Sequence, residues 1–156
     1  MSSSKNSSSM KLTSPAFAEG ATIPERYTCN GGDISPPLEI SGVPHDAKSL
    51  ILVMDDPDAP VGVWDHWVAF NIDPKTLIIA EGAASTTGTL GSNGGGTAAY
   101  AGPCPPSGTH RYIFTLYALS TTLSLPEGAS KSKVIATMNG NVIAMAELMG
   151  RYGKDK

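Results

Sequence analysis

Three short segments of the chain place side chains that could bind a small ligand next to rigid turns. They are "DDPDAP" at residues 55–60, "VWDHW" at 63–67 and "GPCPPSGTHRY" at 102–112. Each segment enters or leaves a stretch that has the composition of a β-strand. Histidine, aspartate, tyrosine and backbone N–H groups beside apolar walls are the usual make-up of a small-ligand pocket, and neighbouring strand ends can bring them together. The sequence therefore predicts a pocket at the ends of strands.

The first segment restrains two carboxylates. Each proline fixes its own φ and pushes the preceding residue toward extended geometry, so Asp56 and Ala59 have few conformations open to them. The carboxylates of Asp56 and Asp58 then become fixed hydrogen-bond acceptors. They could serve a site, or they could satisfy nearby backbone N–H groups in an Asx turn. This segment alone leaves both alternatives open.

The second segment places an imidazole among aromatic side chains. In an extended chain Trp64 and His66 share one face, while Asp65 and Trp67 share the other. We therefore expect an aromatic wall beside the His66 ring. A packed, hydrogen-bonded histidine without a ligand is the alternative.

The third segment stiffens the backbone before a histidine. Its three prolines donate no hydrogen bond, and Gly108 lets the chain turn or come close to a bound group. Rigidity of this kind lowers the ordering cost of binding. His110 and Tyr112 then alternate onto one strand face, which pairs an imidazole with a phenol. A structural turn that leads into a strand is the alternative.

Three apolar runs predict the strands that position these segments. Residues 48–55 form a continuous apolar run typical of a strand buried on both faces, and residues 66–72 and 111–119 predict two more. Residues 81–100 are small, polar and rich in glycine, and a loop of this length within a domain is usually functional or mobile. We expect it to cover part of the site.

One helix is predicted, near the C-terminal end. Ser130 can cap its start, and Gly150 is a natural stop. The prediction for the chain is thus a mainly β protein with one late amphipathic helix. The apolar residues that recur at spacings of three and four are Val134, Met138, Val142, Met145 and Met149.

Composition limits the class of protein. A chain of 156 residues with 40% hydrophobic content can bury a core as one domain, and we assign residues 10–156 to that domain and 1–9 to a flexible tail. The net charge of −3 argues against nucleic-acid binding. The tail lacks the apolar segment of a signal peptide, and no later run is long enough to span a membrane, so we expect a cytoplasmic protein without integral membrane association.

The two cysteines are too few for a disulfide scaffold and lack the spacing of a zinc site. In a cytosolic protein we expect Cys29 and Cys104 to be free thiols. A single bridge between them is the alternative.

The ordered motifs "DPDAP", "WDHWVAFNI" and "Y-x-G-P-C-P-P-S-G-T-H-R-Y" resemble the phosphatidylethanolamine-binding protein family, in its bacterial and archaeal branch. The resemblance extends from Met10 to Gly153. It implies a β-sandwich with a large central sheet, a smaller second sheet and a C-terminal helix. It also implies one small cavity that accepts phosphate or phosphorylated head groups, and a protein that inhibits a kinase or protease partner.

The resemblance also assigns ligand-binding residues. We expect His66, His110 and Tyr112 to donate hydrogen bonds to the anion, while Asp56 holds a histidine in a donating tautomer. The full set that it implies is Asp56, Asp58, Trp64, His66, Cys104, Pro105, Pro106, His110 and Tyr112.

Two other functions stay open from the sequence. An enzyme could act on small phosphorylated substrates, with His66 and His110 as acid and base. We do not expect one, because no nucleophile motif is present. A metal site could use Asp56, Asp58, His66 and His110, although no tight ligand spacing supports it. No cofactor is expected, and a homodimer is left open.

Overall fold

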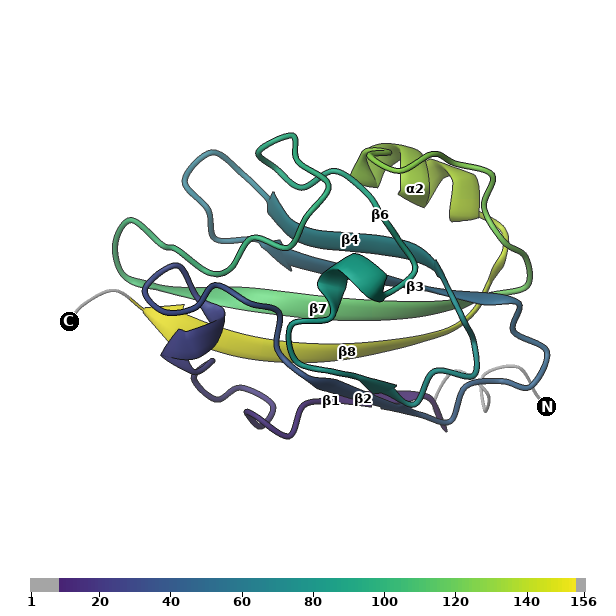
Figure 1. Cartoon of the computed structure of the whole chain (residues 1–156), viewed down its shortest axis with the longest axis horizontal. Helices are drawn as coiled ribbons and strands as arrows, with labels where there is room; N and C mark the ends of the chain where they lie inside the picture. The colour runs from purple at the N-terminus through teal and green to yellow at the C-terminus, as the bar shows by residue number, and fades with distance from the viewer. Residues whose placement is uncertain (1–8, 154–156) are drawn as a thin grey trace.

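Two antiparallel β-sheets, an α-helix and two short 3-10 helices make up the computed structural model, which describes residues 9–153 (Figure 1). The larger sheet has five strands in the order β6-β4-β3-β7-β8, and the smaller has three in the order β1-β2-β5. The mainly β fold with a large and a small sheet is therefore confirmed. The elements are β1 (Lys11–Thr13), η1 (Glu25–Tyr27), β2 (Leu38–Ser41), β3 (Ser49–Asp56), β4 (Trp64–Ile72), β5 (Ile78–Ile79), η2 (Ala84–Thr86), β6 (Thr89–Leu90), β7 (Thr109–Leu119), α2 (Lys131–Met138) and β8 (Val142–Gly153).

The centre of the large sheet consists of the three strands that the sequence predicts. The expected strands at residues 48–55, 66–72 and 111–119 correspond to β3, β4 and β7. In β3 the buried residues run almost without interruption, because the small sheet covers one face of the strand and α2 covers the other. Strands buried on both faces read as continuous apolar runs, which is why this one could be recognised.

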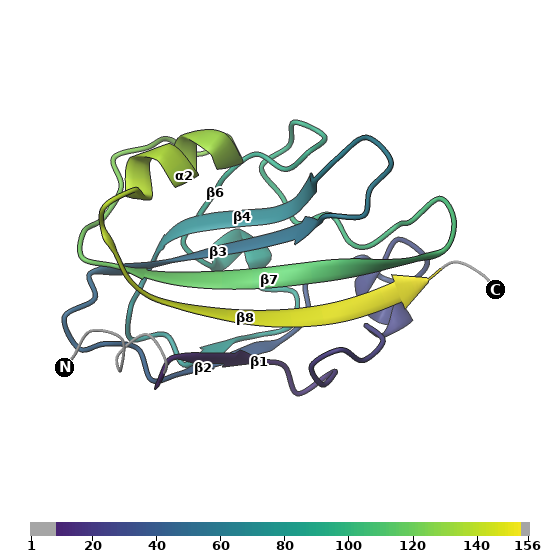
Figure 2. The same cartoon turned by 180° about the vertical axis from the view of Figure 1, so that it is seen from behind.

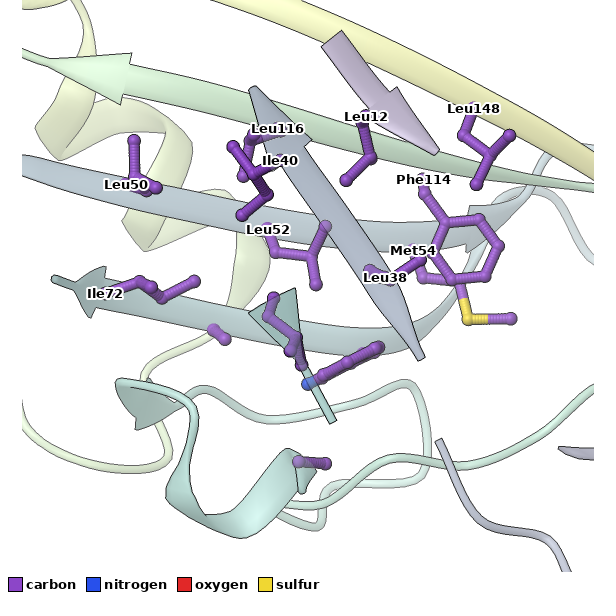
Figure 3. Packing of buried hydrophobic residues seen from close by; sticks show 14 of the residues in the cluster. Leu12, Leu38, Ile40, Leu50, Leu52, Met54, Ile72, Phe114, Leu116 and Leu148 are labelled. Atoms are coloured by element: carbon purple, nitrogen blue, oxygen red, sulfur yellow. The ribbon is translucent and has the colours of Figure 1, made fainter. Parts of the chain in front are cut away.

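The main core lies between the two sheets (Figure 3). Leu38 of β2 packs in one cluster with Leu52 of β3 and Phe114 of β7, and all three are fully buried. Burying one such side chain stabilises the fold by about 1.5–3 kcal/mol. A second cluster lies under α2, where Val134 and Met138 cover Ile51 and Phe70. Together the two clusters hold the ends of β3, β4 and β7 in fixed positions.

The predicted C-terminal helix is correct in its first half and wrong in its second. Ser130 does cap α2, since its side chain accepts a hydrogen bond from the Lys133 N–H at 3.2 Å. The helix ends at Met138, however, and Val142–Gly153 forms β8. Gly140 has φ of 87°, so the chain turns there and leaves the helix direction. The apolar spacing suited a helix, but as a strand this segment pairs along the whole of β7, and that pairing decides its structure (Figure 2).

The glycine-rich stretch at residues 81–100 contains short elements rather than one open loop. It includes η2 and the short strand β6, which pairs with β4. Gly94 packs directly on the Trp64 indole, so a Cβ on Gly94 would lie 2.5 Å from Cε2 of that ring. The stretch contacts Trp64, which lines the cavity described below, but it contributes no lining residue itself, so the expectation that it covers part of the site stays a prediction.

Residues 1–8 of the predicted tail lie outside the residues that the structure describes, which begin at residue 9. Within residues 9–153, no helix has the length and apolar character needed to cross a membrane.

Replacing Gly140 with alanine tests why the helix stops where it does. Nothing lies within 4 Å of the place that a Cβ on residue 140 would occupy, so the only cost is the left-handed backbone conformation. We expect Gly140→Ala to lower the free energy of unfolding by about 1 kcal/mol in urea titrations. Gly95→Ala is the matched control, since Gly95 has no positive φ and a Cβ there has ordinary contacts. Equal stability of the two variants would contradict this explanation.

Candidate functional site

A cavity of about 370 Å³ opens where the ends of β3, β4 and β7 meet. Its size suits a small ligand. Of the nine residues that the sequence assigns to a site, all but Asp58 line this cavity. The lining residues are Cys29, Asp33, Asp56, Ala59, Pro60, Val61, Trp64, His66, Ala101, Gly102, Cys104, Pro105, Pro106, His110 and Tyr112.

A β-bulge at the start of β4 brings His66 to the cavity. Met54 of β3 pairs with Trp67 and the next residue, Asp55, pairs with Asp65, so His66 is one extra residue on β4. Trp64 and His66 both line the cavity as predicted, with their ring centroids 4.7 Å apart. The prediction that Asp65 and Trp67 share a face is wrong, because the bulge resets the alternation and sends Trp67 into the main core.

Asp56 holds His110 in place. The last residue of β3 presents Oδ2 at 2.6 Å from Nδ1 of His110, and both residues are buried. Its other oxygen, Oδ1, accepts the backbone N–H of Asp58 at 2.8 Å. The Asx turn and the site are therefore not alternatives, since one carboxylate serves both. An imidazole whose Nδ1–H meets a carboxylate keeps a fixed ring orientation.

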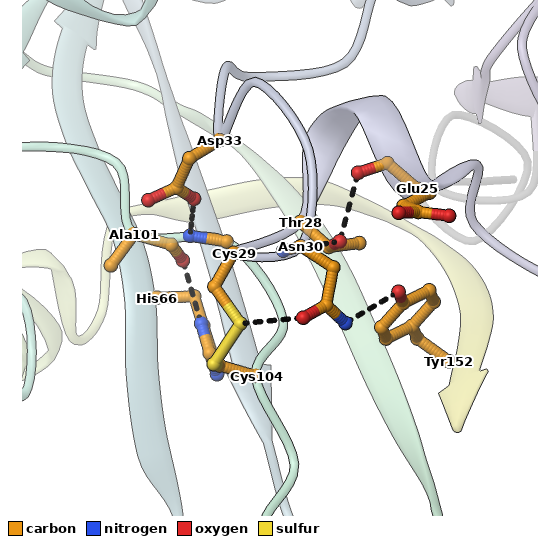
Figure 4. Close-up of a disulfide and its surroundings, with 10 residues drawn as sticks. Glu25, Thr28, Cys29, Asn30, Asp33, His66, Ala101, Cys104 and Tyr152 are labelled. Atoms are coloured by element: carbon orange, nitrogen blue, oxygen red, sulfur yellow. Dashed lines mark hydrogen bonds between the residues drawn. A yellow bond between two sulfur atoms is a disulfide. The ribbon is translucent and has the colours of Figure 1, made fainter. Parts of the chain in front are cut away.

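His66 is held by a different partner, the backbone carbonyl of Ala101. Its Nδ1 lies 2.6 Å from that oxygen, to which it donates a hydrogen bond (Figure 4). Burial lowers the pKa of His66, and the bond to Ala101 offsets only part of this effect. The ring is therefore neutral near pH 7, with its proton on Nδ1 and a lone pair on Nε2.

Tyr112 contributes a hydroxyl that has no partner. The side chain is 0% exposed and lines the cavity, yet its Oη has no hydrogen bond within residues 9–153. The ring centroid lies 5.3 Å from that of His66 and 6.4 Å from that of His110. Burial raises the pKa of Tyr112, and the nearby Asp56 raises it further, so the hydroxyl keeps its proton. A buried donor without a partner is costly unless a ligand or water satisfies it.

Asp58 lies outside the cavity and belongs to a surface ion pair. Its two oxygens accept from Nε and Nη2 of Arg111 at 2.9 and 2.8 Å, and Oδ2 also accepts the Arg111 backbone N–H. These hydrogen bonds lower the pKa of Asp58 to about 2. Asp58 thus braces the turn after β3 against β7 without lining the cavity.

The expectation of free thiols is wrong, because Cys29 and Cys104 form a disulfide (Figure 4). The two residues are 75 positions apart in the chain, and their Cα atoms are 5.5 Å apart. Both line the cavity. Sequence separation concealed this proximity, which depends on the loop after η1 lying against the proline segment.

Several lining residues were not predicted from the sequence. Asp33 has a φ of 57°, and its Oδ1 accepts the Gly102 N–H at 2.8 Å, which ties two loops together. Ala101 acts through its backbone alone: its carbonyl oxygen accepts from His66 Nδ1, and its N–H donates to the His66 backbone carbonyl at 2.9 Å. A backbone acceptor leaves no signal in residue type, and a lone aspartate in a polar loop leaves very little.

The geometry does not favour the metal alternative. Within the part of the chain that the structure describes, no three histidine, cysteine, aspartate or glutamate side chains are close enough together to hold a metal ion. Asp58, one of the proposed ligands, is instead paired with Arg111.

Comparison with known proteins decides the family. The family model described as phosphatidylethanolamine-binding protein matches residues 13–153. The chain belongs to the phosphatidylethanolamine-binding protein family. It is 51% identical over 148 residues to the UPF0098 protein of Methanothermobacter thermautotrophicus, which covers 92% of this chain and 98% of that relative.

Solved structures of this family have the same fold. A homolog from Chlamydia trachomatis superimposes with a TM-score of 0.91 at 47% identity, covering 94% of this chain and 99% of its own. Escherichia coli YbcL, described as a member of the mammalian family, gives a TM-score of 0.87 at 31% identity, with the same coverage of 94% and 99%.

The buried neutral form of His66 predicts how stability depends on pH. Because folding lowers the His66 pKa, the unfolded state takes up the proton first as pH falls, so the free energy of unfolding decreases below about pH 6.5. We expect an NMR titration of the His66 ring to give a midpoint below about 6.5. Urea titrations between about pH 7.5 and about pH 5.5 should show a shallower pH dependence in His66→Gln than in the parent. A His66 midpoint at or above the ordinary value would contradict the assignment.

Proposed function

We propose that the cavity binds the phosphate group of a small phosphorylated ligand, and that the protein acts by binding and not by catalysis. The observation that carries the proposal is the Tyr112 hydroxyl, which is buried, protonated and without a partner at the cavity wall. Two imidazoles lie beside it, and each has its Nδ1 engaged by the protein, so that Nε2 is the atom left for a ligand. Phosphate oxygens accept hydrogen bonds from all three groups when both rings are protonated.

The tautomers of the two histidines predict how ligand binding depends on pH. A neutral imidazole whose only proton is on Nδ1 can accept at Nε2 but cannot donate there. The expectation that Asp56 holds a donating tautomer therefore needs correction, because its bond to Nδ1 of His110 makes Nε2 a donor only in the imidazolium form. An anion in the cavity favours that cationic form in both rings. Binding should then be accompanied by proton uptake.

The apolar part of the cavity supports an organic ligand over a bare ion. Pro105, Pro106 and Val61 line the cavity together with the Trp64 ring. Apart from the indole N–H of Trp64, these side chains offer no hydrogen bonds, and their apolar surface lowers the local polarity, which strengthens hydrogen bonds in the site. The volume exceeds what one phosphate needs, so a short substituent can accompany it.

The family name, phosphatidylethanolamine-binding protein, supports a phosphorylated head group as one ligand of this kind. The lining residues include no serine, threonine or lysine, both cysteines are in the disulfide, and the Asp56 carboxylate and the Nδ1 atoms of both histidines are already engaged by hydrogen bonds within the protein. This supports a binding role over the enzymatic alternative. Inhibition of a kinase or protease, a homodimer and a cytoplasmic location stay predictions.

Removing the Tyr112 hydroxyl tests the proposal. We expect Tyr112→Phe to weaken binding of O-phosphoethanolamine about tenfold in isothermal titration calorimetry, because a hydrogen bond to a charged group contributes about 1.5–3 kcal/mol. The same variant should be at least as stable as the parent without ligand, since the hydroxyl has no partner to lose.

Tyr117→Phe is the matched control, because Tyr117 lies on the same strand and packs beside the cluster under α2. It should bind the probe as the parent does. Equal affinity of Tyr112→Phe and the parent would contradict the proposal. Hydrolysis of phosphate esters that is lost in His110→Ala would favour the enzymatic alternative.

A further inference from the structure

The Cys29–Cys104 disulfide forms part of the cavity wall. Both cysteines line the cavity, and both are exposed to solvent on its rim. Figure 4 shows the bond joining the loop after η1 to the segment that runs from Ala101 toward the prolines. A reagent in solution can therefore reach the sulfur atoms at the same opening that a ligand uses.

The joined segment also orients a ligand-binding histidine. The Ala101 carbonyl oxygen accepts the hydrogen bond from His66 Nδ1, and Cys104 is three residues farther along the chain. Apart from the disulfide, this segment is held to the loop by hydrogen bonds from Gly102 N–H to Asp33 and from Cys29 N–H to the Pro103 carbonyl. At its start, the Ala101 N–H also donates to the His66 backbone carbonyl at 2.9 Å. Hydrogen bonds such as these open by local fluctuation far more readily than a covalent bond does.

The loop on the other side has a separate anchor. Asn30 donates from Nδ2 to the hydroxyl of Tyr152, near the end of β8, at 2.8 Å. If the disulfide opened, the loop would stay attached to β8, and the segment from residue 101 to residue 107 would gain freedom. The Ala101 carbonyl would then be held near His66 mainly by the hydrogen bond from the Ala101 N–H to the His66 backbone carbonyl, so this acceptor would be less firmly fixed.

The floor of the cavity does not depend on the disulfide. Asp56 and His110 lie within β3 and β7, which pair with each other along most of their length. Their contact at 2.6 Å is buried. The two histidines should therefore respond differently to cleavage of the disulfide.

We propose that the Cys29–Cys104 disulfide is a redox-sensitive latch on the cavity, so that the oxidised protein binds phosphate tightly and the reduced protein binds it weakly. The inference rests on the proposed function for the affinity change, but its effect on His66 is independent of any ligand. The latch acts by holding the Ala101 carbonyl against His66 and by keeping the rim ordered before binding, which lowers the cost of association.

The reductant that fits an exposed disulfide is a dithiol. Its thiolate attacks one sulfur atom to form a mixed disulfide, and the other cysteine leaves as a thiolate. The second thiol of the reductant then attacks the mixed disulfide and releases the first cysteine. Two electrons pass to the protein, both cysteines become thiols after protonation, and the dithiol becomes a disulfide.

The experiment compares oxidised and dithiothreitol-reduced protein with two readouts. Calorimetry with O-phosphoethanolamine should give about tenfold weaker binding after reduction. Long-range ¹H–¹⁵N NMR of the histidine rings, without ligand, should show His66 locked with its proton on Nδ1 in the oxidised protein and exchanging between tautomers in the reduced protein. His110, held by Asp56, should not change.

The double variant Cys29→Ser, Cys104→Ser is the control for the reductant. It should match the reduced parent in both readouts and should not respond to dithiothreitol. The proposal is overturned if reduction leaves the affinity and the His66 tautomer unchanged, if the disulfide resists the reductant, or if reduction unfolds the protein. If the oxidised protein does not bind the phosphate probe, the proposed function fails, while the response of His66 still tests the latch.

Discussion

The Asp56 carboxylate joins the end of β3 to the turn that follows it and to the start of β7, through its two oxygen atoms. One oxygen closes the turn after β3 by accepting the Asp58 N–H, and the other accepts from His110 at the start of β7. Asp56 can do this only because β3 and β7 pair directly, so that their ends lie at the same edge of the sheet. The orientation of His110, the path of the turn that carries Ala59 and Val61 to the cavity, and the place of the ligand all follow from this one buried group.

Two kinds of support surround the cavity. The floor consists of strand residues whose positions are set by core packing, as Tyr112 shows by being fully buried between the two histidines. The rim consists of loops held by a disulfide and a few hydrogen bonds. His66 connects the two, since it lies on β4 but takes its orientation from a rim carbonyl. The strands fix the positions of the ligand-binding side chains, and the loops of the rim are the part of the site whose conformation can change.

The sequence was sufficient for features that depend on local composition. The run at residues 48–55 predicted a strand buried on both faces, and Ser130 marked the start of α2. The sequence was insufficient where pairing between strands decides the local structure. Val142, Met145 and Met149 have the spacing of a helix, and pairing with the long strand β7 overrides this local pattern. The bulge at His66 arises from the register with β3, so the position of Trp67 could not be read from alternation.

The candidate site likewise contains residues that the sequence predicted and residues that only the tertiary structure brings together. The family resemblance, which the three motifs carry, identified eight of the fifteen lining residues. Asp58 was included because of its neighbours in the chain, although Arg111 engages it outside the cavity. The Ala101 carbonyl and the pairing of Cys29 with Cys104 required knowledge of how distant loops meet.

The central claim is that protonated histidines and the Tyr112 hydroxyl together bind an anion. Sulfate tests it most directly, because it stays a dianion across the range in which histidines titrate, so any pH dependence of its binding comes from the protein. Calorimetry should show sulfate binding more tightly at about pH 6 than at about pH 8, with proton uptake revealed by buffers of different ionisation enthalpy. Binding that is unchanged or weaker at the lower pH, or that takes up no proton, would contradict the account.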